Sequence, residues 1–458
     1  MSAPLSAGNA ARSDTLSREH KRVLLATGAG TTIEWYDFFI YAQAAALVLG
    51  PLFFAPASGG SAGAANLISL ATIGISFLFR PLGAIVAGRF GDKLGRKKML
   101  VLTLFLMGGS TLLVGLLPTY KQIGVAAPII LIVLRIVQGF SAGGEWGGAA
   151  LMAVEHAPVH RRGFFGAAPQ IGTAVGLILS TGTLYILSQL ISPADFQSWG
   201  WRIPFLLSIL LVVIGFLIRR SVEESPVFEE MLKRKKESSA PLKELFKFHS
   251  KEVLQTALIF IAINAAGYLL IAFFITYGTK SLKMDRGTVL LCIILASVGW
   301  LVATIYGGAL SDRIGRVRTF QIGFVLLLVW QLPMFLLVDT ANSVWFAVGL
   351  IVMGLALGLT YGPQSALYAE MFPTSVRYSG VSIGYATGAI LGGAFAPYIA
   401  QLLLDDTGWS GSVGLYIMGL TLISLITVST VKETRGNDLH VAEADASLLE
   451  APAGAAVR

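Results

Sequence analysis

Long apolar stretches follow one another along most of the chain, separated by short polar segments. About 20 residues of helix, rising 1.5 Å each, match the ~30 Å hydrocarbon core of a bilayer. Apolar runs of this length predict twelve membrane-spanning helices, near residues 22–50, 65–89, 99–118, 127–149, 164–190, 203–220, 251–277, 288–310, 317–338, 343–368, 379–404 and 413–431.

One long polar segment, 221–250, follows the sixth span and divides the chain into two sets of six. We therefore expect one six-helix bundle over 22–220 and a second over 251–432, with polar tails at 1–21 and 433–458. The clustered lysines and arginines of the central segment, mixed with Leu and Phe, fit an amphipathic helix on anionic lipid. They fit a solvated linker equally well, and the sequence leaves both open.

Basic residues are distributed unevenly among the polar segments. With the N-terminus in the cytoplasm, they fall on the cytoplasmic side in a ratio of roughly five to one, as the positive-inside rule requires. Both termini are then expected in the cytoplasm, and the protein in the bacterial inner membrane. The net charge of +8 has this topological cause and gives no reason to expect a nucleic-acid partner.

Composition agrees with a polytopic membrane protein. Hydrophobic residues make up 55% of the chain and charged residues 13%, and the mean hydropathy is +0.72. A soluble globular protein has about 25% charged residues. The single cysteine, Cys292, excludes an internal disulfide and a thiolate metal site.

Short motifs recur in the two halves in register. Gly88-x-x-x-Asp92-x-x-Gly95-Arg96 returns 220 residues later as Gly308-x-x-x-Asp312-x-x-Gly315-Arg316. Glu155-x-x-Pro158-x-x-x-Arg162 returns 215 residues later as Glu370-x-x-Pro373-x-x-x-Arg377, and Gly139-x-x-x-Gly143 as Gly354-x-x-x-Gly358. The sequence thus encodes a six-span duplication, the parallel-repeat design of transporters whose site lies between the halves at mid-membrane.

At these motifs the chain resembles the major facilitator superfamily, whose hallmark is the GxxxDxxGRKK loop between the second and third spans. The resemblance implies an all-α protein of twelve spans in two pseudo-symmetric six-helix bundles. Charged groups at such a cytoplasmic loop can latch neighbouring helices and separate when the halves rock. We expect this gating role for Asp92, Arg96, Glu155, Arg162, Asp312, Arg316, Glu370 and Arg377.

Four further runs resemble the metabolite:proton symporter family: EWYDFFIY, FLFRPLG, LRIVQGFSAGGEWGG and SWGWRIPF. That family includes shikimate, α-ketoglutarate, citrate and proline/betaine permeases, and the unbroken runs look most like the shikimate-type members. Leu94 stands where the keto-acid permeases carry a histidine. Only 22 residues follow Gly436, whereas osmosensing betaine members carry a long C-terminal coiled coil.

A few charged residues lie deep within predicted spans, all in the N-terminal half: Glu34, Asp37, Arg80, Arg135 and Glu145. Arg80 lies twelve residues before Asp92, about 18 Å along a helix from the cytoplasmic loop, which is beyond snorkelling distance. Intramembrane charges are costly unless they pair or face an aqueous cavity. A static cluster tying helices together is one interpretation, and proton coupling around a cavity is the other.

The resemblance implies roles for these charges. In proton-coupled relatives with a similar first span, an acid there pairs with an arginine of the fourth span, and by position these are Asp37 and Arg135. We expect Asp37 to carry the proton, Arg135 to be its switch partner and Glu34 to be a second acid. Arg80 is the candidate ligand for a substrate carboxylate. Glu145 lies ten residues beyond Arg135 and is expected near the inner gate.

Uncharged polar and aromatic residues in the spans provide weaker candidates for substrate contacts. They are Gln138, Gln170, Asn264, Tyr268, Gln364 and Tyr385. No metal, nucleotide or nucleophile constellation is evident in the sequence, so we expect neither a cofactor nor enzymatic activity.

The leading hypothesis is a monomeric symporter that imports a small organic acid with protons by alternating access. Shikimate-like hydroxy-acids come first as substrates, followed by dicarboxylates or other monocarboxylates. A proton-coupled exporter of the same fold is the main alternative. A transport-dead membrane sensor, with the central segment 221–250 as its output, is the third.

Overall fold

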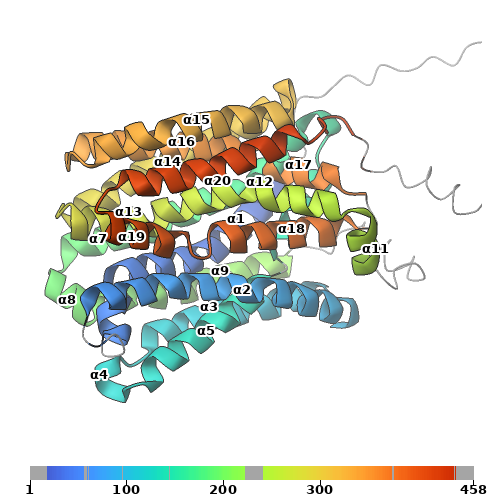
Figure 1. Cartoon of the computed structure of the whole chain (residues 1–458). Coiled ribbons are helices and arrows are strands. Elements are labelled where there is room, and N and C mark those ends of the chain that lie inside the picture. The colour runs from blue at the N-terminus through green and yellow to red at the C-terminus, as the bar shows by residue number, and fades with distance from the viewer. Residues whose placement is uncertain are drawn as a thin grey trace, which may run out of the picture.

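The computed structural model describes residues 18–55, 59, 61–94, 96–143, 145–221, 241–373, 376–437 and 439. Side chains are not described for 18–23, 26, 87–101, 218–221 and 241–244. Helices make up all the regular structure in this part of the chain, and they run side by side in one bundle (Figure 1).

The described residues of the N-terminal half form six helical columns. In chain order they are α1 (Arg18–Ala44) continued by the π-helix η1 (Ala45–Phe54), α2 (Ala62–Leu94), α3 (Arg96–Leu116), α5 (Ala126–Ala142) with α6 (Glu145–Glu155), α7 (Arg162–Leu190) and α9 (Ile203–Ser221). The short helices α4 (Tyr120–Ile123), η3 (Val159–Arg161), α8 (Pro193–Ser198) and η4 (Gly200–Arg202) lie in the connections.

The C-terminal half repeats this pattern after the short helix α11 (Pro241–Phe248). Its first column is α12 (Ser250–Tyr268), η5 (Leu269–Phe273), α13 (Phe274–Thr276) and η6 (Tyr277–Ser281). The others are α14 (Arg286–Ile314), α15 (Arg316–Val338), α16 (Ser343–Tyr361) with α17 (Gln364–Met371), α18 (Arg377–Gly392) with α19 (Ala396–Thr407), and α20 (Gly411–Ser429).

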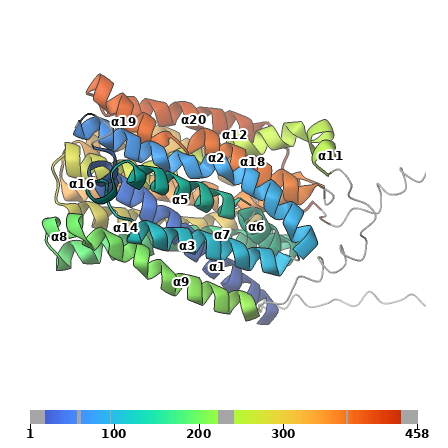
Figure 2. The same ribbon diagram turned by 90° about the horizontal axis from the view of Figure 1, so that it is seen from below.

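These columns match the twelve predicted spans. Among the described residues, eleven helices are long and apolar enough to cross a membrane, and Leu102–Leu116, part of α3, is a shorter apolar helix. The first described helix begins at the same end of the bundle as α11 and the end of α9 (Figure 2). That end is the one that the distribution of basic residues predicts to be cytoplasmic, and below it is called the inner end.

The first helix of each half is the most enclosed. The most apolar stretch of Thr27–Phe54 is 83% buried, and the most apolar stretch of Ser250–Ser281 is 94% buried. The corresponding share is 39% for the most apolar stretches of Gly200–Leu217, Arg316–Val338 and Gly411–Ser429, which leave apolar side chains on the outside of the bundle. The two first helices therefore lie at the centre, where the halves meet, and they are placed to line a site between them.

Glycines set the crossing of α5 over α2 in the N-terminal half. A Cβ at Gly139 would collide with the backbone oxygen of Ser76, and one at Gly143 with the backbone oxygen of Arg80. Small residues allow helix backbones this close approach. The Gly-x-x-x-Gly run is thus a helix-contact face, as the ordinary interpretation of such a run expects.

The C-terminal half contains the same crossing at the equivalent positions of α16 and α14. A Cβ at Gly354 would collide with the backbone oxygen of Ala296, and one at Gly358 with that of Trp300. Each α14 residue lies 220 positions after its α2 counterpart, and each glycine 215 positions after its own. The duplication seen in the motifs therefore extends to residue-by-residue packing.

The central segment lies mostly outside the described residues, since 222–240 is not described. The described part of the segment includes α11, in which Leu245 is buried and Phe246 and Phe248 are exposed.

Candidate functional site

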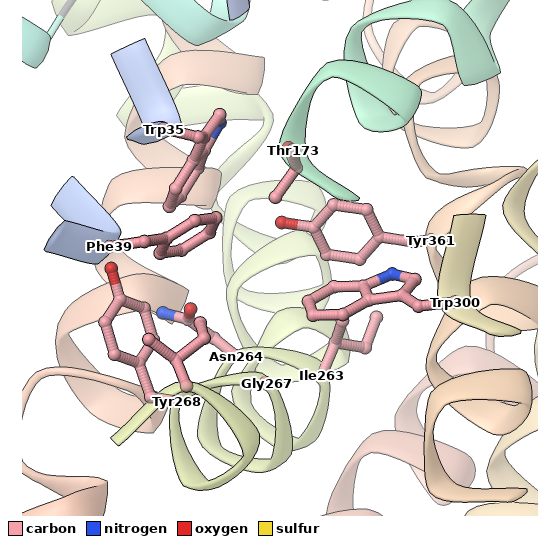
Figure 3. A pocket seen from close by; sticks show the side chains of 10 residues that line it. Trp35, Phe39, Thr173, Ile263, Asn264, Gly267, Tyr268, Trp300 and Tyr361 are labelled. Carbon is pink, nitrogen blue, oxygen red and sulfur yellow. The ribbon is translucent and has the colours of Figure 1, made fainter. Parts of the chain in front are cut away.

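A small cavity lies where the two halves meet, at mid-height of the bundle. Its volume is about 10 Å³, room for a single water molecule. Figure 3 shows aromatic rings around it, with the Tyr361 hydroxyl pointing inward. The lining residues are Trp35, Phe39 and Thr173 of the N-terminal half and Ile263, Asn264, Gly267, Tyr268, Ile271, Trp300 and Tyr361 of the C-terminal half. The helices must move apart before a metabolite fits here.

Arg80 lies in α2 next to these cavity residues and is 3% exposed. Its guanidinium carbon is 4.3 Å from the ring centroid of Phe38, 4.4 Å from that of Phe77 and 5.4 Å from that of Trp35. Aromatic faces attract a cation, but they do not satisfy N–H donors. Nε and Nη2 of Arg80 are buried without a hydrogen-bond partner. The guanidinium is thus held by rings and keeps donors free for an anion.

Two tyrosines of the C-terminal half lie near this cation. Tyr268 and Tyr385 are both within electrostatic range of Arg80 and of Glu34, which is 4% exposed. The Tyr268 hydroxyl is buried without a hydrogen-bond partner. The Tyr385 ring stacks on Trp146 at 3.7 Å between centroids, across the boundary between the halves. The predicted residues Glu34, Arg80, Tyr268 and Tyr385 therefore gather around one centre.

Arg135 lies in α5 and is 1% exposed. Both of its terminal nitrogens bind neutral groups, while its Nε is buried without a hydrogen-bond partner. Its Nη1 donates to Gln138 Oε1 at 2.7 Å, and its Nη2 donates to Ser76 Oγ at 2.6 Å and to Ile73 O at 3.3 Å. The guanidinium carbon also lies 3.8 Å from the ring centroid of Tyr41. Ser76 and Gln138 therefore fix the position of this cation.

Asp37 lies near the middle of the column formed by α1 and η1 and is 2% exposed. Its carboxyl group lies beside the Thr111 hydroxyl of α3, and Glu34 is its acidic neighbour. Its Oδ1 is buried without a hydrogen-bond partner. Among the ion pairs of the described side chains, none joins Asp37 to Arg135. In this conformation Gln138 and Thr111 lie between the two members of the expected coupling pair, whose role stays a prediction.

The remaining predicted substrate contacts differ in their surroundings. Gln170 Nε2 donates to Gln364 Oε1 at 3.1 Å, which links the halves. Asn264 lines the cavity, but its amide donates to Ala389 O at 3.1 Å within the C-terminal half. Glu145 begins α6 and is half-buried next to Trp146. Gln170 and Gln364 thus lie where the halves must separate, and Asn264 is anchored to one of them.

A network of charges joins the halves at the inner end. Asp312 accepts hydrogen bonds at 2.8 Å from the backbone N–H groups of Gly163 and Phe164, which lie in the first turn of α7. A helix N-terminus favours a negative charge. Arg316 of α15 forms ion pairs with Asp312 at 2.7 Å and with Glu370 of α17 at 3.2 Å. Through Arg316, Asp312 is therefore also connected to α15 and α17.

A second inter-half contact at this end is the ion pair between Arg377 and Glu155, at 3.2 Å. Arg162 donates to the backbone oxygen of Asn437, beyond α20. Glu433 accepts from the backbone nitrogens of Arg316 and Val317. The predicted gating residues of the described part thus meet at one end of the bundle. Asp92 and Arg96 belong to the same prediction, but their side chains lie outside the described ones.

Comparison with known proteins places this architecture in a family. Residues 36–397 match the family model of the Major Facilitator Superfamily.

The chain belongs to the major facilitator superfamily.

Relatives within the superfamily cover nearly the whole chain. The inner membrane metabolite transport protein YhjE of Escherichia coli (strain K12) is 41% identical over 424 residues, which are 91% of this chain and 95% of that protein. The shikimate transporter of Escherichia coli (strain K12) is 36% identical over 431 residues, 92% and 96% of the two chains. This superfamily member is therefore a multi-pass inner-membrane transporter and not an enzyme.

A solved structure carries the same fold. The crystal structure of a D-xylose-proton symporter gives a TM-score of 0.73 at 19% identity, with 92% of this chain and 99% of that chain covered. At this identity the likeness concerns the fold alone. The fold expected from the sequence, an all-helical transporter of the major facilitator type, is confirmed.

Several residues of the site in this transporter escaped the sequence-based prediction. Ser76 accepts a hydrogen bond from Arg135, and Thr111 lies beside Asp37. The rings of Phe38 and Phe77 pack against the guanidinium of Arg80. Phe77 precedes Arg80 by three residues and so lies on the same helix face. That spacing was available in the sequence, whereas no local signal distinguishes Thr111 from other membrane threonines.

Proposed function

We propose that this transporter is a proton-coupled symporter that imports a small organic acid by alternating access. Asp37 and Arg135 form the coupling pair, with Glu34 as a second acid, and Arg80 binds the substrate carboxylate. Shikimate-like hydroxy-acids are the first substrate class, since the relatives include a shikimate transporter. Other mono- and dicarboxylates come next.

The observation that carries this proposal is the state of Arg80. A buried donor without a partner costs about 1–3 kcal/mol, and Arg80 has two such donors, Nε and Nη2. A carboxylate that binds Arg80 relieves this cost through charge-assisted hydrogen bonds, which are bidentate in the best geometry. Aromatic rings on several sides limit the hydration of the guanidinium, which strengthens its attraction for an anion.

The cavity supports a cyclic substrate with hydroxyl groups. Its walls combine rings, which pack against an apolar ring face, with polar groups at Thr173, Asn264, Tyr268 and Tyr361. Ligand pockets are mostly apolar with a few placed polar groups. In a more open conformation Gln170, Gln364 and Tyr385 border the same space as additional substrate contacts, with Gln138 behind Arg135.

Two arginines and two acids within the spans support proton coupling. A carboxyl group enclosed in protein is stabilised in its neutral form by loss of hydration and in its charged form by a nearby cation. In this conformation Arg135 is engaged with Gln138 and Ser76, and Asp37 has an oxygen without a donor. When the proton leaves Asp37, Arg135 can turn to the carboxylate, and the helices that carry them move together.

The charges at the inner end act as the gate in this proposal. Asp312, Arg316 and Glu370 hold α14, α15 and α17 together, and Asp312 also binds α7 of the other half. Opening to the cytoplasm separates α7 from α14, so the backbone contacts of Asp312 must break. We assign Glu155, Arg162, Arg377, Asp92, Arg96 and Glu145 to the same gate.

The test replaces Asp37 by Asn in the full chain, reconstituted in lipid vesicles with labelled shikimate as probe. We expect uphill accumulation driven by a pH gradient to be lost, while exchange of labelled for unlabelled shikimate across the vesicle membrane remains. Asp406→Asn, an exposed acid beyond the site, serves as the matched control and should accumulate normally. Accumulation that survives in Asp37→Asn contradicts the proposal. Accumulation that rises in cells when an uncoupler is added indicates export instead of import.

A further inference from the structure

Two hydrogen bonds connect α5 to α3 and end beside Asp37 of α1. Arg135 donates to Gln138 Oε1 at 2.7 Å, and Gln138 Nε2 donates to Thr111 Oγ1 at 2.7 Å. The Thr111 hydroxyl lies beside the Asp37 carboxyl group. Thr111 is 0% exposed, so no bulk water competes for these contacts.

The donors and acceptors of this connection are fixed by its cationic end. A guanidinium has donors only, so Gln138 must turn its oxygen toward Arg135. The Gln138 amide nitrogen then faces Thr111 and must donate to it. One lone pair of the Thr111 hydroxyl is therefore occupied by Gln138 in this conformation.

A threonine hydroxyl has one hydrogen and two lone pairs. In this conformation Thr111 Oγ1 donates its hydrogen to the backbone oxygen of Met107 at 3.1 Å. With one lone pair accepting from Gln138, only a lone pair remains toward Asp37. Thr111 therefore gives no hydrogen to Asp37 here, and Asp37 Oδ1 has no hydrogen-bond partner. A buried carboxyl group without a donor favours its neutral form, so this arrangement fits the proton-loaded site.

We propose that Thr111 is the positioning residue of the proton site: its hydrogen points to Met107 O when Asp37 is protonated and to the carboxylate when Asp37 is charged. Because this rotation moves the lone pair that Gln138 uses, the protonation state of Asp37 reaches the guanidinium of Arg135. The inference rests on the proposed function, in which Asp37 carries the proton.

Other ionisable groups surround Asp37, and the test must separate them from Thr111. Glu34 and Tyr36 lie on its own helix, and the Tyr36 hydroxyl donates to Pro204 O at 3.0 Å. The neighbouring helices α2, α5 and α12 carry Arg80, Arg135 and Tyr268. None of these groups is changed in the variants below.

The experiment follows the infrared carbonyl band of protonated carboxyl groups in the purified full chain in lipid, as a function of pH. The part of the band that disappears in Asp37→Asn reports Asp37. Thr111→Val keeps the shape and removes the hydroxyl, Thr111→Ala removes it with a smaller side chain, and Thr111→Ser keeps it. Thermal unfolding of each variant confirms that it is folded.

We expect the Asp37 band in Thr111→Val and Thr111→Ala to titrate about one pH unit higher than in the wild type, because a hydrogen bond to a charged group is worth more than one to a neutral group. Thr111→Ser should keep the wild-type midpoint. A wild-type midpoint in both Thr111→Val and Thr111→Ala overturns the inference and leaves the proposed function standing. A titrating band that survives intact in Asp37→Asn overturns the proposed function itself.

Discussion

The two halves of this transporter use the same helix crossing with opposite chemistry. Gly139 and Gly143 fit against α2 as Gly354 and Gly358 fit against α14. The side chains around the two crossings differ position by position. In the N-terminal half they are Ser76, Arg80, Arg135 and Gln138, and at the equivalent positions of the C-terminal half they are Ala296, Trp300, Leu350 and Met353.

The difference shows that the crossing itself needs no charge. The C-terminal half closes the same backbone contacts with apolar side chains, and Leu350 and Ala296 are fully buried. Replacing buried charges by apolar groups is often neutral or stabilising by about 1–4 kcal/mol. Packing alone does not require the polar network around Arg135. The comparison therefore favours a role in proton coupling over a static ion-pair cluster that only ties helices together.

The strongest test converts the N-terminal crossing to the composition of its counterpart, with Ser76→Ala, Arg135→Leu and Gln138→Met together. We expect proton-driven accumulation to fall to the background of empty vesicles, since the switch cation and its two side-chain partners are gone. The melting temperature should stay equal or rise, because apolar groups replace buried polar ones.

The matched control for this triple variant is Leu350→Met in the C-terminal half, which should transport normally. If the triple variant still accumulates substrate, the polar network is only structural and the contrast between the halves has no functional meaning.

The next largest effect is expected at the pair Arg80 and Trp300, which occupy equivalent positions of α2 and α14. Arg80→Gln removes the charge that binds the substrate carboxylate, so affinity should fall about 100-fold, the equivalent of ~2.8 kcal/mol. Trp300→Phe keeps an aromatic wall and should change affinity by less than about fivefold, within the ~1 kcal/mol of a modest packing change. Calorimetric titration of the purified protein with shikimate and related acids measures both. Equal losses in the two variants would mean that substrate binding is shared symmetrically.

A smaller effect is expected at the duplicated loop motif. Asp312→Asn weakens the contacts with the first turn of α7, so the inner end should open more often, by about tenfold for a loss of ~1.4 kcal/mol. The measurement is the rate at which a thiol reagent reaches a cysteine at Ser365→Cys, in a chain carrying Cys292→Ser. The equivalent variant Asp92→Asn should act in the same direction. An unchanged labelling rate in Asp312→Asn contradicts its assignment to the gate.

The smallest difference is expected between the two glycine crossings themselves. Gly143→Ala and Gly358→Ala each push a methyl group against a backbone carbonyl, and each should destabilise the protein by about 1–3 kcal/mol. Thermal unfolding in one detergent compares them directly, with Gly419→Ala, which meets open space, as control. A large difference between Gly143→Ala and Gly358→Ala would show that the crossings are not equivalent.

The sequence predicted the fold closely because a bilayer permits few solutions. Every backbone polar group must be satisfied within its own span, so apolar length alone marks the helices. The predicted span 203–220 became Ile203–Ser221, for example. The predicted span 251–277 extends to Ser281 through π-helical segments. Hydropathy carries no information on that change of hydrogen-bond register, which packing against neighbouring helices determines.

The candidate site was predictable in part. Depth along a helix follows from counting residues, so the sequence alone identified Arg80, Arg135 and Asp37 as intramembrane charges, and the duplicated motifs identified the acids and arginines of the inner end. Rotation of each helix about its axis and the conformational state do not follow from counting. Only the tertiary structure decided that Arg135 binds Ser76 and Gln138, that Thr111 stands beside Asp37 and that aromatic rings enclose Arg80. Those contacts join residues far apart in the sequence, and their geometry depends on how whole helices pack.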